Sequence, residues 1–216
     1  MFRKFMNHEK GITGLETAII LIAFVVVAAV FAYTALSAGL FSTQKAQEAV
    51  YAGLKEARST LELKGGIIAT ANTTGSSGNI KQISFIVSNV LGGESIDFTE
   101  PTASSGNTGI ADTTVDSNVV VLNYTDQYQA VDNLYWQFEP LGSDDGDDLL
   151  ESNEKFQITV GSSTVGSGGG NLIDALTTRA LGPKTTFNLE VLTPVGAVLQ
   201  IERTTPPWID TIMNLR

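Results

Sequence analysis

The segment from Thr17 to Gln44 constrains the fold of this chain most, because its 28 residues include no charged side chain. Its central part, residues 19–31, is apolar throughout. A helix at the surface of a water-soluble protein has a polar face, and this segment has none in its first half. About 20 apolar residues are enough to cross the hydrocarbon core of a bilayer. We therefore expect a helix that is buried in lipid, in its own domain or among copies of itself.

The remainder of the chain has the size of one ordinary domain and an acidic composition. The 216 residues carry a formal net charge of −10, and from Gly65 onward there are 18 acidic and 6 basic residues. Nucleic acid is not expected as a partner, because phosphate binding needs clustered Lys and Arg. The chain has no cysteine, and its single histidine is His8 in the N-terminal tail. Cysteine chemistry is therefore excluded, histidine-dependent catalysis is disfavoured, and we expect no enzyme.

The N-terminal segment, residues 1–11, is short and net positive, which is typical of export or membrane insertion with the basic end inside. Three interpretations compete. A secretory signal would be cut near residues 35–38, although the helical pattern continues past that point. A permanent anchor would keep the N-terminal segment. A third possibility is cleavage between Gly11 and Ile12.

Glu16 favours the third interpretation, because a carboxylate costs free energy as it enters lipid and an unpaired buried charge costs several kcal/mol. Cleavage after Gly11 would create an ammonium group at Ile12, four residues upstream. The run from Lys10 to Glu16, followed by the apolar stretch, resembles the processing site of type IV pilin-like precursors. The resemblance implies that a prepilin-type signal peptidase cuts after the glycine. It also implies that the glutamate pairs with the N-terminal amine of a neighbouring subunit.

The helical pattern continues beyond the apolar stretch, with apolar residues at near-heptad spacing as far as Leu61. Gly65-Gly66 is the expected stop signal, which predicts one helix over about residues 12–63. Such a helix is about 78 Å long at ~1.5 Å per residue, more than one globular domain can cover. Small residues that allow close helix packing occur in two pairs, which are Ala28 with Ala32 and Ala35 with Gly39. The pattern therefore favours a bundle of copies.

The residues after the helix predict a domain of antiparallel strands. Residues 67–78 are rich in Thr, Ser and Gly and predict a loop. Six segments rich in β-branched or aromatic residues follow, at 80–90, 115–124, 134–138, 155–160, 185–192 and 197–203, with a short helix expected around 171–180. In the segment 185–192, Phe187, Leu189 and Val191 alternate onto one face, and residues 193–196 predict a hairpin turn after it. The predicted fold class is α+β, with an Ig-like antiparallel β-sandwich after the long hydrophobic helix. The expected organisation is a cleaved leader (1–11), an assembly and transmembrane helix (12–64) and an outward-facing sandwich (65–216).

Three loop features have possible site chemistry. Residues 144–154 contain six carboxylates, either as a solvated loop or as a site for a calcium-like ion with Asp145, Asp147 and Glu151 as ligands. The glycine-rich segment 161–170 lacks the Lys-Ser/Thr ending of a phosphate loop and is expected to be a flexible loop. Asn72 and Asn123 each begin an Asn-x-Thr sequon, so they are candidate sites for an N-linked glycan. No cofactor is required.

The chain resembles archaellins, the archaeal flagellins. The resemblance rests on the runs 14–19 and 196–206 and on Glu151, Glu154 and Phe156. It implies a filament that assembles through N-terminal helices and carries an outer β-sandwich, with glycosylation usual and a bound metal in some members. It also implies a precursor in the cell membrane and partners in a signal peptidase, an assembly ATPase and a membrane platform. Without residues 1–11 the mature chain has a net charge of −12, which would keep neighbouring filaments apart.

Several functions remain open at the level of the sequence. The first hypothesis is the repeating subunit of an archaellum, a surface filament for swimming. The second is an adhesive archaeal pilin, which motility tests would separate from the first. The third is an uncut, membrane-anchored binding domain, which would retain residues 1–11. An anchored hydrolase is disfavoured, because no pair of nucleophile and base can be named.

Overall fold

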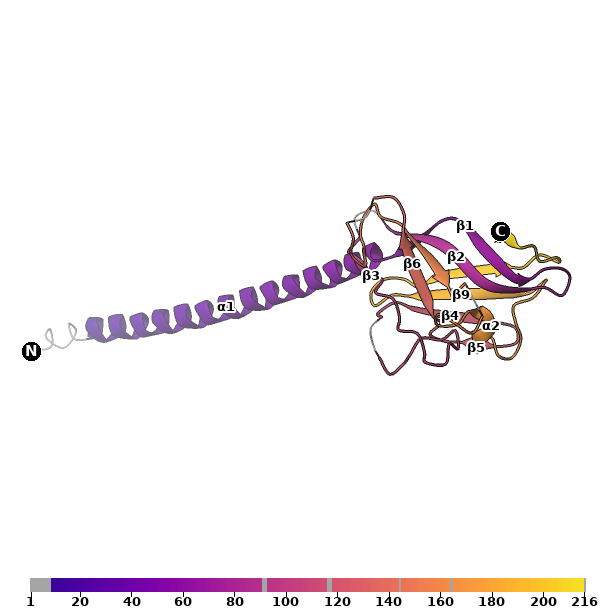
Figure 1. Cartoon of the computed structure of the whole chain (residues 1–216). Coiled ribbons are helices and arrows are strands. Elements are labelled where there is room, and N and C mark those ends of the chain that lie inside the picture. Colours follow the sequence, from indigo (N-terminus) through magenta and orange to yellow (C-terminus); the bar gives the residue numbers. More distant parts are fainter. Residues whose placement is uncertain (1–8, 91–92, 116–117, 144, 164, 216) are drawn as a thin grey trace, which may run out of the picture. The chain divides into compact units, whose positions relative to one another are not determined.

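The computed structural model describes residues 9–90, 93–115, 118–143, 145–163 and 165–215 (Figure 1). The chain divides between Ala52 and Gly53 into two compact units. Most of helix α1 (Glu9–Arg58) lies in the first unit. The last turn of this helix belongs to the second unit. Its 50 residues give a length of about 75 Å at ~1.5 Å per residue. It contains no proline, and its interior glycines do not interrupt it.

The second unit is a β domain in which every strand pairing is antiparallel. One sheet has the order β11 (Ile212–Leu215), β1 (Leu61–Thr73), β2 (Asn79–Asn89), β8 (Phe156–Val160) and β6 (Trp136–Pro140). The other has the order β10 (Leu199–Thr204), β9 (Thr186–Leu192), β4 (Val121–Asp126) and β5 (Ala130–Val131). A small ladder joins β3 (Ile96–Asp97) to β7 (Leu149–Leu150), and helix α2 spans Leu172–Ala175.

The two large sheets contribute to one continuous hydrophobic core, as in a sandwich. Strand β9 shows the pattern, because Phe187, Leu189 and Val191 are all buried, as their alternation predicted. Trp136 is fully buried and packs edge-to-face on Phe98, with ring centroids 5.8 Å apart. The predicted fold class, a long hydrophobic helix followed by an antiparallel sandwich, is thus confirmed.

The C-terminal end of the long helix differs from the prediction. Helix α1 ends at Arg58 rather than near residue 63, and strand β1 begins at Leu61. Leu61 is 4% exposed in the sandwich core, and Glu62 forms an ion pair with Lys64 in the same strand. The near-heptad pattern was misleading here, because pairing with β2 places Leu61 and Leu63 on the core side. Tertiary packing outweighs the helix propensity of these residues, which is high for Leu, Glu and Lys but is only a weak determinant of the final structure.

Gly65-Gly66 lies inside β1 rather than at the end of a helix. The pairing of β1 with β2 shifts register between Lys64 and Ile68, and Gly65 has a φ of +77°, as in a β-bulge. A Cβ on Gly66 would lie 2.6 Å from the side chain of Asn214 on β11. The segment that was predicted as a loop from residue 67 is therefore mostly strand. It is bent and packs closely against β11.

Other predicted boundaries also change. Strand β4 begins at Val121, not at residue 115, and α2 is one turn rather than ten residues. Asn171 caps α2, because its side chain accepts a hydrogen bond from the Ile173 N–H at 2.9 Å. Strands β3, β5 and β7 were missed because two residues carry no periodicity.

The glycine-rich segment is packed at its ends, contrary to the expectation of a flexible loop. Gly161, Gly169 and Gly170 are buried and have positive φ values. A Cβ on Gly169 would lie 2.5 Å from the ring of Tyr135, and one on Gly161 would lie 2.6 Å from the backbone of Asn171. Only glycine allows these close approaches, so the composition reflects packing.

Candidate assembly site

The exposed surface of α1 is the main candidate for a functional surface. Every residue from 14 to 57 is exposed. These exposed residues include large apolar side chains, such as Phe24, which is 74% exposed, and Leu21, which is 66% exposed. Covering one such side chain is worth ~1.5–3 kcal/mol, so the helix requires cover along its whole length. Within the described chain nothing provides it, and by length and composition the helix could also cross a membrane.

The small residues of α1 lie along one face. Ala28, Ala32, Ala35 and Gly39 follow one another at spacings of four, three and four residues, which places them above one another on a helix. All four are exposed, and a Cβ on Gly39 would meet nothing within 4 Å in the described chain. No contact inside the chain therefore requires small side chains here, whereas close approach of a second helix would.

The predicted processing site lies at the beginning of α1. Lys10, Gly11 and Ile12 have helical backbone, while residues 1–8 of the expected leader lie outside the described residues, as do the side chains of 9–13. Glu16 is one turn further along the helix and is exposed, so its carboxylate is open to a partner outside the chain. The pairing of Glu16 with an amine at Ile12 of another subunit remains a prediction.

The last turn of α1 is joined to the β domain within the second unit. Lys55 forms an ion pair with Glu94 at 2.9 Å. The turn after β9 approaches the helix end so closely that a Cβ on Gly196, which has a φ of +106°, would collide with the carbonyl oxygen of Ser59. This turn was predicted from residues 193–196, but its contact with the helix end was not. The contact joins residues more than a hundred positions apart, so the sequence carried no local signal for it.

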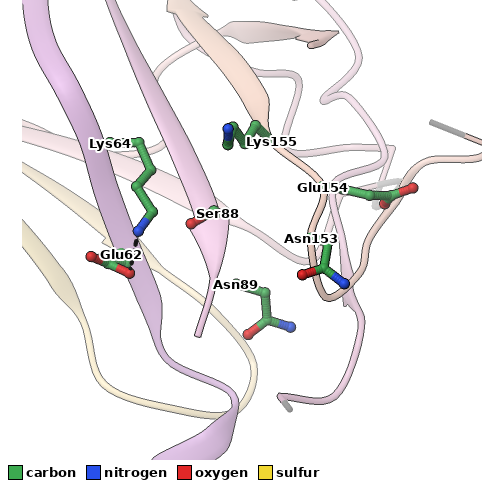
Figure 2. A pocket seen from close by; sticks show the side chains of 7 residues that line it. All are labelled: Glu62, Lys64, Ser88, Asn89, Asn153, Glu154 and Lys155. Atoms are coloured by element: carbon green, nitrogen blue, oxygen red, sulfur yellow. Dashed lines mark hydrogen bonds and ion pairs between the residues drawn. The ribbon is translucent and has the colours of Figure 1, made fainter. Parts of the chain in front are cut away.

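A polar groove of about 300 Å³ opens at the beginning of β1. Figure 2 shows Lys64 paired with Glu62 at 2.7 Å on one wall and Lys155 on another. Asn89, only 5% exposed, lines the groove and donates from its side-chain amide to the carbonyl oxygen of Glu94. The groove draws on three separate segments of the chain, and its lysines and glutamates balance in number. It has the composition of a solvated surface hollow rather than of a reaction centre.

Comparison with known proteins identifies the family of this chain. The sequence model of archaeal-type flagellins matches residues 11–203. The chain belongs to the archaeal-type flagellin family. "Probable flagellin 1" of Archaeoglobus fulgidus is 38% identical over 100% of this chain and 99% of its own length. "Probable flagellin 2" of the same organism is 40% identical over 95% of this chain and 94% of its own length.

A solved filament structure supports the same assignment for this flagellin. The archaeal flagellum of Methanospirillum hungatei strain JF1 matches with a TM-score of 0.58 at 28% identity, covering 94% of this chain and 98% of that chain. A flagellin is a structural subunit of a flagellar filament, so the predicted function is confirmed and an adhesive pilus is not favoured. The exposed apolar helix of this flagellin is then the surface that a polymer would cover.

The two candidate glycosylation sites of the flagellin differ in exposure. Asn72 lies near the end of β1 and is exposed. Asn123 is half-buried in β4, which pairs with both β9 and β5. Its side-chain oxygen accepts a hydrogen bond from the backbone N–H of Asn133 at 3.0 Å. A glycan is attached through the side-chain nitrogen, and at Asn123 that nitrogen belongs to a half-buried side chain held in place by this bond, so Asn72 is the more accessible of the two.

The acidic segment does not assemble a cation site among the described residues. Asp145, Asp147 and Glu151 are all exposed, and no group of three or more metal-ligating side chains comes together in the described ranges. Asp147 instead accepts the backbone N–H of Leu149 at 2.8 Å, and Glu154 accepts that of Glu151 at 3.0 Å. Asp144 lies outside the described residues. The calcium-like ion remains a prediction from the sequence.

Proposed function

We propose that this flagellin is made as a membrane-inserted precursor, loses residues 1–11 and polymerises through α1 into an extracellular filament for swimming. The observation that carries the proposal is the exposure of every residue from 14 to 57 on a helix with no charge between Thr17 and Gln44. Lipid can cover this helix before assembly, and copies of the same helix can cover it afterwards. The outer sandwich has its own core and does not need the helix for burial.

Leader removal is the first proposed step. A prepilin-type signal peptidase would cut between Gly11 and Ile12, and the family match begins at residue 11. Both Gly11 and Gly14 lie in the first two turns of α1, where each weakens the helix by ~1 kcal/mol relative to alanine. A weakened helix end can unwind to expose the peptide bond to the enzyme.

The charge pair at the new N-terminus is the second proposed step. Cleavage leaves an ammonium group on Ile12, and the exposed carboxylate of Glu16 in a neighbouring subunit would bind it. Charges that are several kcal/mol unfavourable when buried alone become tolerable when paired. The pair would therefore fix the axial register of each subunit as it leaves the membrane, because only one alignment brings both groups together.

Helix packing then provides the contacts of the bundle. Transfer of α1 from lipid to a bundle gains little hydrophobic free energy, because both surroundings are apolar. The stripe of Ala28, Ala32, Ala35 and Gly39 allows close backbone approach and hence dispersion contacts. Extraction from the membrane needs an external source of work, which we assign to an assembly ATPase acting through a membrane platform.

The N-terminal residue of filament protein recovered from the cell surface tests this proposal. Intact mass and terminal peptides should show a chain that begins at Ile12. Gly11→Val should leave full-length precursor in the membrane and abolish swimming, whereas the matched variant Gly14→Val should be processed normally. Recovery of surface protein that begins at Met1 would exclude leader processing and, with it, the proposed charge pair.

A further inference from the structure

The loop before β7 contains the one Asp-Gly dipeptide of the chain, Asp145-Gly146, and the chain has no Asn-Gly dipeptide. In an Asp-Gly sequence the backbone nitrogen of the glycine can attack the aspartyl side chain, because glycine has no side chain to hinder the approach. The described residues of this loop, 142–143 and 145–148, are all exposed. The dipeptide therefore lies where water can reach it.

Gly146 has open space around it in the part of the chain that the structure describes. A Cβ on this residue would meet nothing within 4 Å, and its φ is +92°. It lines an open hollow of about 500 Å³ together with Asp147 and Asp148. Its backbone N–H makes no hydrogen bond to another described residue. A small ring between residues 145 and 146 therefore has room to form.

The carboxylate of Asp145 differs from those of aspartates that are held in place. Asp97 accepts a hydrogen bond from the backbone N–H of Thr99 at 2.8 Å, and Phe98, which follows it, is completely buried. Asp126 accepts two backbone N–H groups of the following turn, at 2.6 and 3.0 Å. Asp145 makes no hydrogen bond or ion pair with another described residue, so its carboxyl group is free to turn toward the backbone.

The loop is fixed to the β domain at its two ends but not at the dipeptide. The backbone N–H of Leu141 donates to the carbonyl oxygen of Lys155 at 2.8 Å. The backbone N–H of Phe98 donates to the carbonyl oxygen of Asp148 at 2.7 Å. Exposed loop tips tolerate insertions, so a backbone that becomes longer between these two anchors should leave the sandwich folded.

We propose that Asp145 is a site of spontaneous isoaspartate formation in the outer domain. The backbone nitrogen of Gly146 bonds to Cγ of Asp145, and the proton of the nitrogen and the hydroxyl of the protonated carboxyl group leave as one water molecule. Water then opens the resulting succinimide. Attack at the Cγ carbonyl restores aspartate, whereas attack at the backbone carbonyl leaves Gly146 joined through Cγ. The second product has one more methylene in its backbone and a free α-carboxylate.

The reaction needs no reactant other than water and does not depend on removal of the leader. It goes beyond the proposed function, because it concerns only the loop before β7. The net charge of the chain is unchanged by it, since one carboxylate replaces another.

Ageing of filaments of the full chain in heavy-oxygen water tests the inference. Each passage through the succinimide adds one heavy oxygen atom at residue 145, whichever carbonyl is attacked. Digestion of the denatured chain after aromatic residues, in ordinary water, separates residues 139–156 from residues 86–98, which contain Asp97. The first peptide should gain label steadily with time, and its fragmentation should place the label at residue 145. The second peptide should gain none.

Asp145→Glu is the matched control variant. It keeps the negative charge and Gly146, but its ring would have six members and forms far more slowly than the five-membered succinimide. Residues 139–156 of this variant should therefore stay unlabelled. Unlabelled filaments of the unaltered chain, equal labelling of residues 86–98, or label that survives Asp145→Glu would each overturn the inference. None of these results changes the N-terminal residue of the filament protein, so the proposed function is tested separately.

Methyl transfer gives a second readout on the unaltered chain. Isoaspartyl O-methyltransferase transfers the methyl group of S-adenosylmethionine to the α-carboxylate of isoaspartate and not to ordinary aspartate. Aged filaments should accept methyl groups on residues 139–156, and freshly made filaments should accept none there. Aged filaments that carry the oxygen label but accept no methyl groups would show that the succinimide returns only to aspartate, which would overturn isoaspartate formation.

Discussion

Single residues in this flagellin act mainly through the backbone conformations and close approaches that they permit. Gly161, Gly169 and Gly170 make the ends of a glycine-rich segment fit between Asn171, Tyr135 and the backbone near residue 107. The middle of the same segment has open space around Gly166. The same residue type therefore has different roles within ten positions.

Replacement of Gly170 by alanine should destabilise the β domain far more than replacement of Gly166. Both have positive φ, which costs ~1–2 kcal/mol for an L-residue. A Cβ on Gly170 would in addition collide with the backbone carbonyl of Asn107, whereas one on Gly166 meets nothing within 4 Å. Urea unfolding should show a clearly lower free energy of unfolding for Gly170→Ala than for Gly166→Ala. Equal urea midpoints for the two variants would contradict this account.

The two sequons are expected to differ in whether they carry a glycan. We expect a glycan on Asn72 and none on Asn123, because only the first is exposed and free of a backbone contact through its side-chain oxygen in the described chain. Glycopeptide mass spectrometry of filaments measures the occupancy of both. Asn72→Gln should remove the added mass, and Asn123→Gln, the matched control, should leave it. An occupied Asn123 beside an unmodified Asn72 would reverse the assignment.

At the scale of elements, α1 and the strands are stabilised in different ways. The helix satisfies its backbone hydrogen bonds internally and leaves its apolar side chains for partners outside the chain. Each strand depends on neighbours that lie far away in sequence, as when β1 pairs with the C-terminal β11. The element that forms most locally is therefore the one whose side chains remain uncovered.

The small-residue stripe gives a prediction for α1. Ala32→Leu should weaken the filament, because a larger side chain keeps neighbouring helices apart, while Ala23→Leu, on the opposite face, should have a smaller effect. Both variants remain apolar, so membrane insertion should be equal. The temperature at which sheared filaments dissociate measures the difference, and identical dissociation temperatures would show that the stripe is not a close-packing face.

At the scale of the whole molecule, charge is divided between the two units. The uncharged stretch lies entirely in the first unit, while the second carries most of the acidic residues. Residues 12–216 have a net charge of −12. A filament that buries the helices would therefore present an acidic exterior.

This distribution predicts that filaments remain dispersed at neutral pH and associate laterally as the pH approaches the sequence pI of about 4.5. Carboxylates take up protons as the pH falls toward this value, so their mutual repulsion decreases. Light scattering of purified filaments across this range checks the expectation, and return to neutral pH should redisperse them. Lateral association that is equally strong at pH 7 in low salt would argue against an electrostatic exterior.

The sequence by itself determined the features that depend on nearby residues. The uncharged run from Thr17 to Gln44 was sufficient to predict α1, because a helix needs only local hydrogen bonds and this one has no polar face. Alternation in β9 was sufficient to place Phe187 and Leu189 in the core of a sandwich. The run from Lys10 to Glu16 resembles a known processing site, and cleavage after Gly11 stays a prediction from the sequence.

Only the tertiary structure decided where the helix gives way to the sheet and which distant residues meet. Leu61 and Leu63 fit a helical stripe and a strand equally well in sequence, and pairing with β2 made them strand. A small hollow beside the end of α1 is lined by Ser59, Val119 and Val195, which come from three segments without a shared local signal. Strand pairing and grooves are made by contacts between distant positions, whose free energy appears only when the chain is folded. Local patterns therefore could not reveal them.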